Sequence, residues 1–214
     1  MMTDMNMNEF LNVLSSKEPV PGGGGACGYV AAVGMSLGNM VLALTTGKKK
    51  YAEYQDEIEK LIVRANDLTK ELAECMDKDA KAFKPLSEAY GLPKDTDEQL
   101  KHREEVMEKA LIAASEAPLS MMEVIVEAIG LIDRISVIGS RLAISDAGVG
   151  VQMCKAALNG ASLNVYINTK LMKDTDVADD MNTRTDELII RGNQMADEAV
   201  SYTHLRAHET LSDL

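Results

Sequence analysis

The chain has 214 residues, 46% of them hydrophobic, and a formal net charge of −12. This length suits one domain, and the acidic balance excludes a protein whose whole surface holds nucleic acid, because phosphate contacts require clustered Lys and Arg. Cys27, Cys75 and Cys154 form no C-x-x-C pair, so the sequence predicts neither a disulfide framework nor a metal site, as suits the cytoplasm.

The first half of the chain predicts helices separated by glycine and proline. With no Trp and only two Phe, the composition favours closely packed helices over a sheet. An apolar stripe predicts a helix over 6–15, and the small, uncharged residues 26–46 predict a second that ends at Gly47. Apolar residues three and four apart from Tyr51 onward predict a long amphipathic helix that ends before 91–94, with a kink or an end near Pro85.

The second half continues the same pattern. Helices are predicted over 97–117, 119–138, 145–171 and 176–199, with Pro118 beginning or bending the second of these and Ser145-Asp146 capping the third. We therefore expect an all-α fold, a bundle of long antiparallel helices with the glycine-rich helix at its centre.

The last residues differ from the rest. The apolar pattern stops after Val200, and SYTHLRAHETLSDL resembles translated adaptor sequence. We expect residues 1–199 to form one helical domain and residues 200–214 to be a non-native or disordered tail. The N-terminus lacks the basic start and apolar core of a signal peptide.

The stretch from Gly22 to Lys50 has three interpretations. Its G-x-G-x-x-G spacing follows Pro-Val-Pro instead of a strand, and Lys48 stands where a dinucleotide site needs an acid, so that interpretation fails. The run of uncharged residues is long enough to span a membrane, but Gly, Ala and polar residues dilute its hydrophobicity, and we expect a buried helix instead. Glycines at a helix start also free N–H groups that suit a carboxylate, although they can equally serve only a tight chain reversal.

Two polar features lie on faces that should be buried. Asp79 falls on the apolar stripe that includes Met76 and Phe83, where a carboxylate is costly unless it is paired or functional. Asp146, Asn164 and Asn168 share one face of the helix predicted over 145–171 with small residues, which leaves room for a ligand or for a closely packed helix.

Six blocks in order resemble the cyclodeaminase/cyclohydrolase family of folate one-carbon enzymes. They are PVPGGGGACG, LTTGKKKY, DAKAFKPLSEAYGLPK, EAPLSMMEV, SDAGVGVQMCKAALNGASLNVYIN and the KD of LMKD. The resemblance extends from about Asn8 to Ala199. The chain has Gly25 where the family commonly has Ser, and Gly139-Ser140 where it has Gly-Asn. The resemblance implies an all-helical, cytoplasmic homodimer without metal or other cofactor, which binds neither nucleic acid nor membrane.

The resemblance also implies the substrate, a tetrahydrofolate derivative with or without a polyglutamate tail. Hydrolysis of 5,10-methenyltetrahydrofolate to 10-formyltetrahydrofolate is favoured, and cyclisation of 5-formiminotetrahydrofolate with loss of ammonia is the alternative. The implied catalytic groups are Asp79, Asp146 and Lys48. The implied substrate-binding residues are Gly22, Gly23, Gly24, Gly25, Lys49, Lys50, Tyr51, Phe83, Lys94, Asn164 and Asn168.

Within these sets, either carboxylate can serve as base or stabilise positive charge, and the two Asn side chains can orient the pterin or the attacking water. The glycines can hold a folate carboxylate, and the lysines can carry a proton or bind the glutamate tail. A rival from a different class is a non-enzymatic helical module that oligomerises through its glycine-rich helix. The glycine and lysine ends of this helix should lie roughly 30 Å apart, so one folate can meet both only if they belong to different chains.

Overall fold

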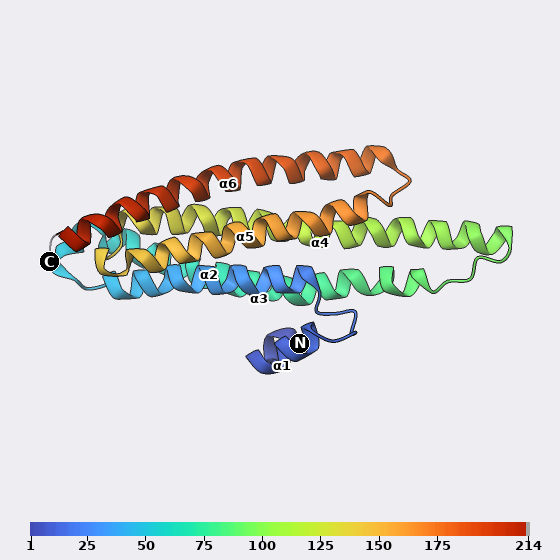
Figure 1. Ribbon diagram of the computed structural model, residues 1–214, viewed down its shortest axis with the longest axis horizontal. Helices are drawn as coiled ribbons and strands as arrows, with labels where there is room; N and C mark the ends of the chain where they lie inside the picture. The colour runs from blue at the N-terminus through green and yellow to red at the C-terminus, as the bar shows by residue number, and fades with distance from the viewer. Residues whose placement is uncertain (213–214) are drawn as a thin grey trace.

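The computed structural model describes residues 1–212, and within that range every regular element is a helix. Five long helices run alternately up and down the molecule (Figure 1). They are α2 (Gly23–Thr45), α3 (Gln55–Tyr90), α4 (Asp97–Ile138), α5 (Ile144–Thr169) and α6 (Thr175–Ser212). The prediction of an all-α bundle is confirmed.

Short helices complete the chain. The segment α1 (Met7–Leu14) is capped by the Asn6 side chain, which accepts from the Glu9 N–H, and lies beside the bundle near the start of α2 (Figure 1). Three 3₁₀ segments are η1 (Met2–Asp4), η2 (Lys49–Tyr54) and η3 (Arg141–Ala143). The last two lie at the end of the bundle where α2 finishes and α5 begins.

The core is built from large side chains of α4 and small residues of α2 and α5. Met121, Ile125 and Ile129 of α4 are fully buried. Between α2 and α5, a Cβ added to Gly34 would lie 2.7 Å from the Gly150 carbonyl oxygen, and one added to Gly150 would lie 2.6 Å from the Gly34 carbonyl oxygen. The two backbones therefore touch at this pair, and any side chain would force them apart.

The packing of α2 also tests whether this helix is a membrane span or a buried helix. Among the described residues, α2 is the one helix long and apolar enough to cross a membrane, with a mean hydropathy of 1.6 in its most apolar window. It nevertheless packs against α3, α4 and α5, and Met35, Val41 and Leu42 are fully buried there. Its apolar composition is thus used in helix contacts.

Several predicted boundaries were wrong. The helix expected from residue 26 begins at Gly23, so three of the four glycines form its first turn. Pro118 does not separate two helices but lies inside α4, and α5 begins at Ile144, with Ser145 and Asp146 in its first turn. Local sequence rules misplace such boundaries because packing along the whole bundle sustains a helix through a locally unfavourable residue.

The C-terminal segment is also helical. Instead of ending near Ala199, α6 continues to Ser212, and Thr203 is buried against Gly148 of α5. Loss of the apolar pattern does not end the helix, since adding a residue to an existing helix costs little. The non-native origin of residues 200–214 stays a prediction, and residues 213 and 214 lie outside the described range.

Candidate active site

A cavity of about 210 Å³ opens where α2 begins, between α3 and the C-terminal part of α5. Seven of the residues predicted from the sequence line it, although three different helices and the glycine turn supply them. They are Gly22, Gly23, Gly24, Asp79, Phe83, Asn164 and Asn168. We take this cavity as the candidate active site because it joins an acid, two amides and a helix N-terminus in one small space.

Asp79 is the ionisable group of the cavity. It lies on α3, half-buried, and its carboxylate accepts a hydrogen bond from the backbone N–H of Gly25 in the first turn of α2. Burial raises the pKa of Asp79 to about 6, while the Gly25 N–H acts in the opposite direction. The first N–H groups of a helix have no partner within the helix, so a carboxylate is a natural acceptor for them.

The absence of a side chain at Gly24 allows the Asp79 carboxylate to approach the backbone of α2. A Cβ built on Gly24 would overlap the carboxylate of Asp79, whereas one built on Gly23 would lie 3.2 Å from the Asn164 amide oxygen. The glycine at position 24 therefore permits the carboxylate to lie directly against the helix backbone.

Each of the two amides is held by a backbone carbonyl group. The Asn164 side-chain nitrogen donates to the Gly160 carbonyl at 3.0 Å within α5. The Asn168 side-chain nitrogen donates to the Ala114 carbonyl of α4, also at 3.0 Å. Because each amide is anchored through its nitrogen, both are presented to the cavity in defined orientations.

Other lining residues were missed by the sequence reasoning. Pro19 and Val20 form one wall, and Ala114 and Ile167 complete the lining. Ile167 offered a signal in the sequence, since it is an apolar residue three positions after Asn164 and therefore lies near it on the same helix. Cys27 lies close enough that the Asp79 charge, after burial itself, helps to raise its pKa to about 11, so this thiol stays protonated at neutral pH.

The predicted lysine cluster lies at the other end of the bundle. Lys48 donates from Nζ to the Ser140 hydroxyl at 3.3 Å, and the Tyr51 hydroxyl accepts from the Arg141 N–H at 3.1 Å. Asp146, in the first turn of α5, belongs to this end as well. The length of α2, from Gly23 to Thr45, separates the lysine cluster from the cavity by roughly 33 Å, at 1.5 Å per residue.

The remaining predicted lysines also lie away from the cavity. Lys49 and Lys50 are exposed at the start of η2, next to Lys48. Lys94 is exposed in the turn between α3 and α4, which projects beyond the start of α2 (Figure 1). The predicted residues at the cavity and those at the lysine end of α2 therefore form two groups that do not meet within one chain, and Lys94 belongs to neither.

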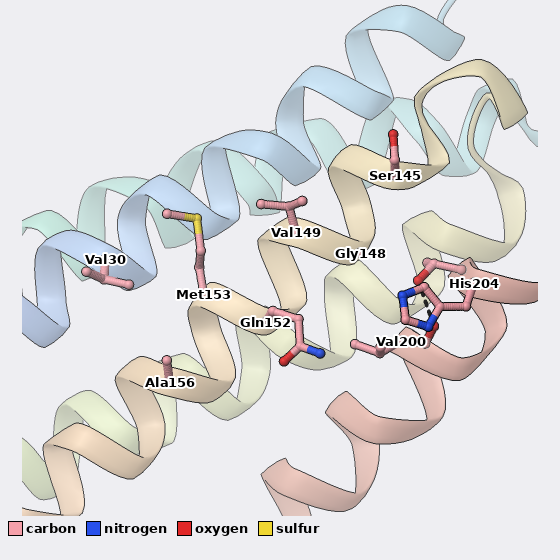
Figure 2. Close-up of a pocket in the computed structure, with 10 residues that line it drawn as sticks. Val30, Ser145, Gly148, Val149, Gln152, Met153, Ala156, Val200 and His204 are labelled. Carbon is pink, nitrogen blue, oxygen red and sulfur yellow. Dashed lines mark hydrogen bonds between the residues drawn. The ribbon is translucent and has the colours of Figure 1, made fainter. Parts of the chain in front are cut away.

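A larger cavity of about 480 Å³ lies elsewhere, between α2, α5 and the last turns of α6. Figure 2 shows Val30, Val149 and Met153 on one side, with Val200 and His204 reaching in from α6. Its walls are mainly apolar, and part of them belongs to the segment after Ala199. Size alone does not make it the reactive site, because it holds no acid–base pair or group of converging amides.

The helical bundle and the candidate active site of about 210 Å³ define the class of protein, an all-helical enzyme whose glycines do not form a nucleotide-binding turn. More particularly, the chain belongs to the formiminotransferase-cyclodeaminase family, whose sequence model matches residues 6–187. Among residues 1–206, whose side chains the structure describes, no three His, Cys, Asp or Glu lie together in a way that can hold a metal ion.

Proteins named for each of the two implied activities, cyclohydrolase and cyclodeaminase, are similar to this chain. A methenyltetrahydrofolate cyclohydrolase of Methylorubrum extorquens is 39% identical over 171 residues, which cover 80% of this chain and 82% of that protein. The formimidoyltransferase-cyclodeaminase of Mus musculus is 28% identical over 173 residues, 81% of this chain but only 32% of that protein. The chain thus corresponds to about a third of the mouse relative.

A solved structure confirms the fold. The crystal structure of formiminotetrahydrofolate cyclodeaminase from Thermotoga maritima superposes with a TM-score of 0.82 and 21% identity, covering 99% of this chain and all of that one.

Proposed function

We propose that this protein hydrolyses 5,10-methenyltetrahydrofolate to 10-formyltetrahydrofolate. The observation that carries the proposal is Asp79, a half-buried carboxylate with a pKa of about 6 beside two anchored amides. The cyclohydrolase from Methylorubrum extorquens, which matches over most of its length, supports the choice of reaction.

A single carboxylate, that of Asp79, can carry out the proton transfers of methenyl hydrolysis. The substrate carries a positive charge over N5, the bridging carbon and N10, and an ionised Asp79 stabilises this cation. As water adds to the carbon, Asp79 accepts a water proton. It then donates that proton to N5 while the bond between carbon and N5 breaks. The intermediate's hydroxyl loses its proton to solvent as the formyl C=O forms, so one proton is released overall.

Asn164 and Asn168 orient the reactants in this scheme. One amide positions the attacking water and the other contacts the pterin, whose ring edge offers donors and acceptors. Phe83 supplies an apolar face for the ring system. Because the base has a pKa close to neutral, it is ionised at pH 7 and still basic enough to accept a proton.

The second candidate is cyclisation of 5-formiminotetrahydrofolate with release of ammonia. It is favoured by the name of the mouse relative. The same carboxylate would then protonate the departing nitrogen. Incubation with each folate separates the candidates: loss of methenyl absorbance indicates hydrolysis, ammonia release with a gain of absorbance indicates deamination, and no change indicates a non-enzymatic helical module.

The role of each carboxylate is tested by Asp79→Asn and Asp146→Asn, assayed separately. Asp79→Asn should abolish hydrolysis, whereas Asp146→Asn affects it only if the far end of the bundle takes part. Full activity in both variants would remove carboxylate catalysis from the proposal.

We further propose a homodimer in which the two residue groups meet across chains. Apolar side chains lie exposed on the neighbouring helices α2 and α5, including Met40, Leu44, Val149 and Leu163. If this face pairs with a second copy running in the opposite direction, the lysine end of one chain approaches the glycine end of the other. Exposed apolar patches of this kind commonly mark interfaces.

Complementation tests this arrangement. Asp79→Asn should be inactive alone, and Lys48→Ala should lose activity if the shared site takes this lysine from the other chain. Mixed subunits should then regain activity, because one of the two sites in a mixed dimer has both residues. A monomer in solution, or a mixture that stays inactive, would contradict the shared site.

The reaction as written requires no metal or other cofactor. Cytoplasmic location is the remaining proposal, and fractionation of cells tests it, since recovery in the membrane pellet would contradict it.

A further inference from the structure

A second cavity, of about 340 Å³, adjoins the candidate active site. Both cavities are lined by Pro19, Val20 and Phe83, so these three residues form the boundary between them. The rest of the second cavity comes from one face of α3, where residues three and four positions apart lie together. These residues are Ala80, Lys84, Ser87 and Glu88.

The character of the lining changes along α3. The part next to the active site is apolar, with Val20, Ala80 and Phe83, and the far part is polar, with Lys84, Ser87 and Glu88. Such a gradient suits a ligand with a ring near the reaction centre and a charged group beyond it. Among the described residues that line either cavity, Lys84 is the only cation.

Lys84 is available to bind an anion. Its Nζ lies 4.0 Å from the Glu88 carboxylate, and the two side chains are 77% and 69% exposed. An exposed pair at this separation contributes little to stability, so a ligand carboxylate can replace Glu88 at small cost. Glu88 itself weakens binding there, because it competes for the same ammonium group.

The distances along the helices favour Lys84 over Lys48, Lys49 and Lys50 as the residue that binds the distal end of the substrate. From Asp79 to Lys84 is five residues, about 7.5 Å along the axis of α3, whereas Lys48 lies roughly 33 Å from the glycine turn. Of these two lysine positions within one chain, Lys84 is therefore the one placed to meet the distal end of a substrate whose reacting carbon lies at Asp79.

We propose that the second cavity binds the aminobenzoyl-glutamate part of the folate, with the ring against Val20 and Phe83 and a glutamate carboxylate on Lys84. This inference rests on the proposed function and assigns a role to a lysine outside the predicted site. Lys84 is a specificity-determining residue here, since it contacts the substrate far from the reacting atoms.

The test compares Lys84→Ala, Glu88→Gln and a control, Lys81→Ala, which removes an exposed lysine of α3 that lines neither cavity. Each is assayed with methenyltetrahydrofolate and with the analogue that lacks the glutamyl group. Lys84→Ala should raise KM for the full substrate about two- to fivefold with kcat nearly unchanged, and leave KM for the analogue unaltered. Glu88→Gln should lower KM for the full substrate about twofold.

Salt and binding measurements complete the design. Added NaCl should raise KM of the wild type for the full substrate and have less effect on Lys84→Ala, because salt screens an exposed charge pair. Calorimetry with 10-formyltetrahydrofolate, with and without its glutamyl group, gives the same comparison without turnover.

Equal KM values for Lys84→Ala and the wild type, or the same change with both substrates, would overturn the inference. If the wild type turns over neither folate, the proposed function fails instead. The calorimetric difference between the wild type and Lys84→Ala then still decides whether Lys84 binds the carboxylate.

Discussion

Replacing Asp79 by Asn should stabilise the protein while abolishing its activity. The pKa of Asp79 rises from 3.8 to about 6 on folding, because burial penalises the charged carboxylate. The folded state therefore binds the proton more tightly, and the free energy of unfolding falls as pH rises from about 4 to about 6. A shift of about two units corresponds to about 3 kcal/mol above pH 6.

The expected gain in the free energy of unfolding is smaller than about 3 kcal/mol, because the cavity opens to solvent and water screens the charge of Asp79. Asn removes the charge and still accepts from the Gly25 N–H, so we expect about 1–2 kcal/mol at pH 7.5, or about 3–6 °C in Tm. By pH 4 the wild-type carboxylate is itself largely protonated, and the difference should nearly vanish. The variant should lose about 10²–10⁴-fold in kcat for methenyl hydrolysis, as is usual when a general base is removed.

Urea unfolding at pH 7.5 and pH 4, together with methenyl absorbance, measures both effects. Asp77→Asn is the matched control, since Asp77 is also on α3 but accepts from the Met2 N–H at 2.8 Å, and its loss should not stabilise. For the wild type, kcat/KM should rise with pH through about 6 as Asp79 ionises. A destabilised Asp79→Asn at pH 7.5, or one that retains most of its activity, would refute the reasoning.

Three further substitutions follow from the backbone contacts. Gly24→Ala should fold but lose at least about tenfold in kcat, because its methyl group displaces the carboxylate; normal activity would contradict that geometry. Gly23→Ala meets only an amide oxygen at 3.2 Å and should cost less than about threefold, measured in the same assay. Gly150→Ala should lower the free energy of unfolding by about 1–3 kcal/mol in urea, since its Cβ meets the Gly34 carbonyl; an unchanged midpoint would show that α2 and α5 can separate freely.

The sequence predicted those residues of the candidate site whose positions on a helix face are unusual. Asp79 was found because it interrupts an apolar stripe, and Asn164 and Asn168 because they share a face with small residues. Gly24 was recognised as one of four glycines, but its particular contact with the carboxylate was not foreseen. Lys84 carried no such signal, since a lysine on an exposed helix face looks the same whether or not a cavity lies beside it.

The sequence by itself determined the helices, because apolar spacing, Gly47 and the absence of strand-forming stretches are local properties of the chain. It also carried the family resemblance in six ordered blocks. Only the tertiary structure decided which predicted residues meet: it placed Asp79 against Gly25 and set Lys48 at the far end of α2. The reason is that helices separated along the chain align according to side-chain packing, such as the contact of Gly34 with Gly150, and no local pattern specifies that alignment.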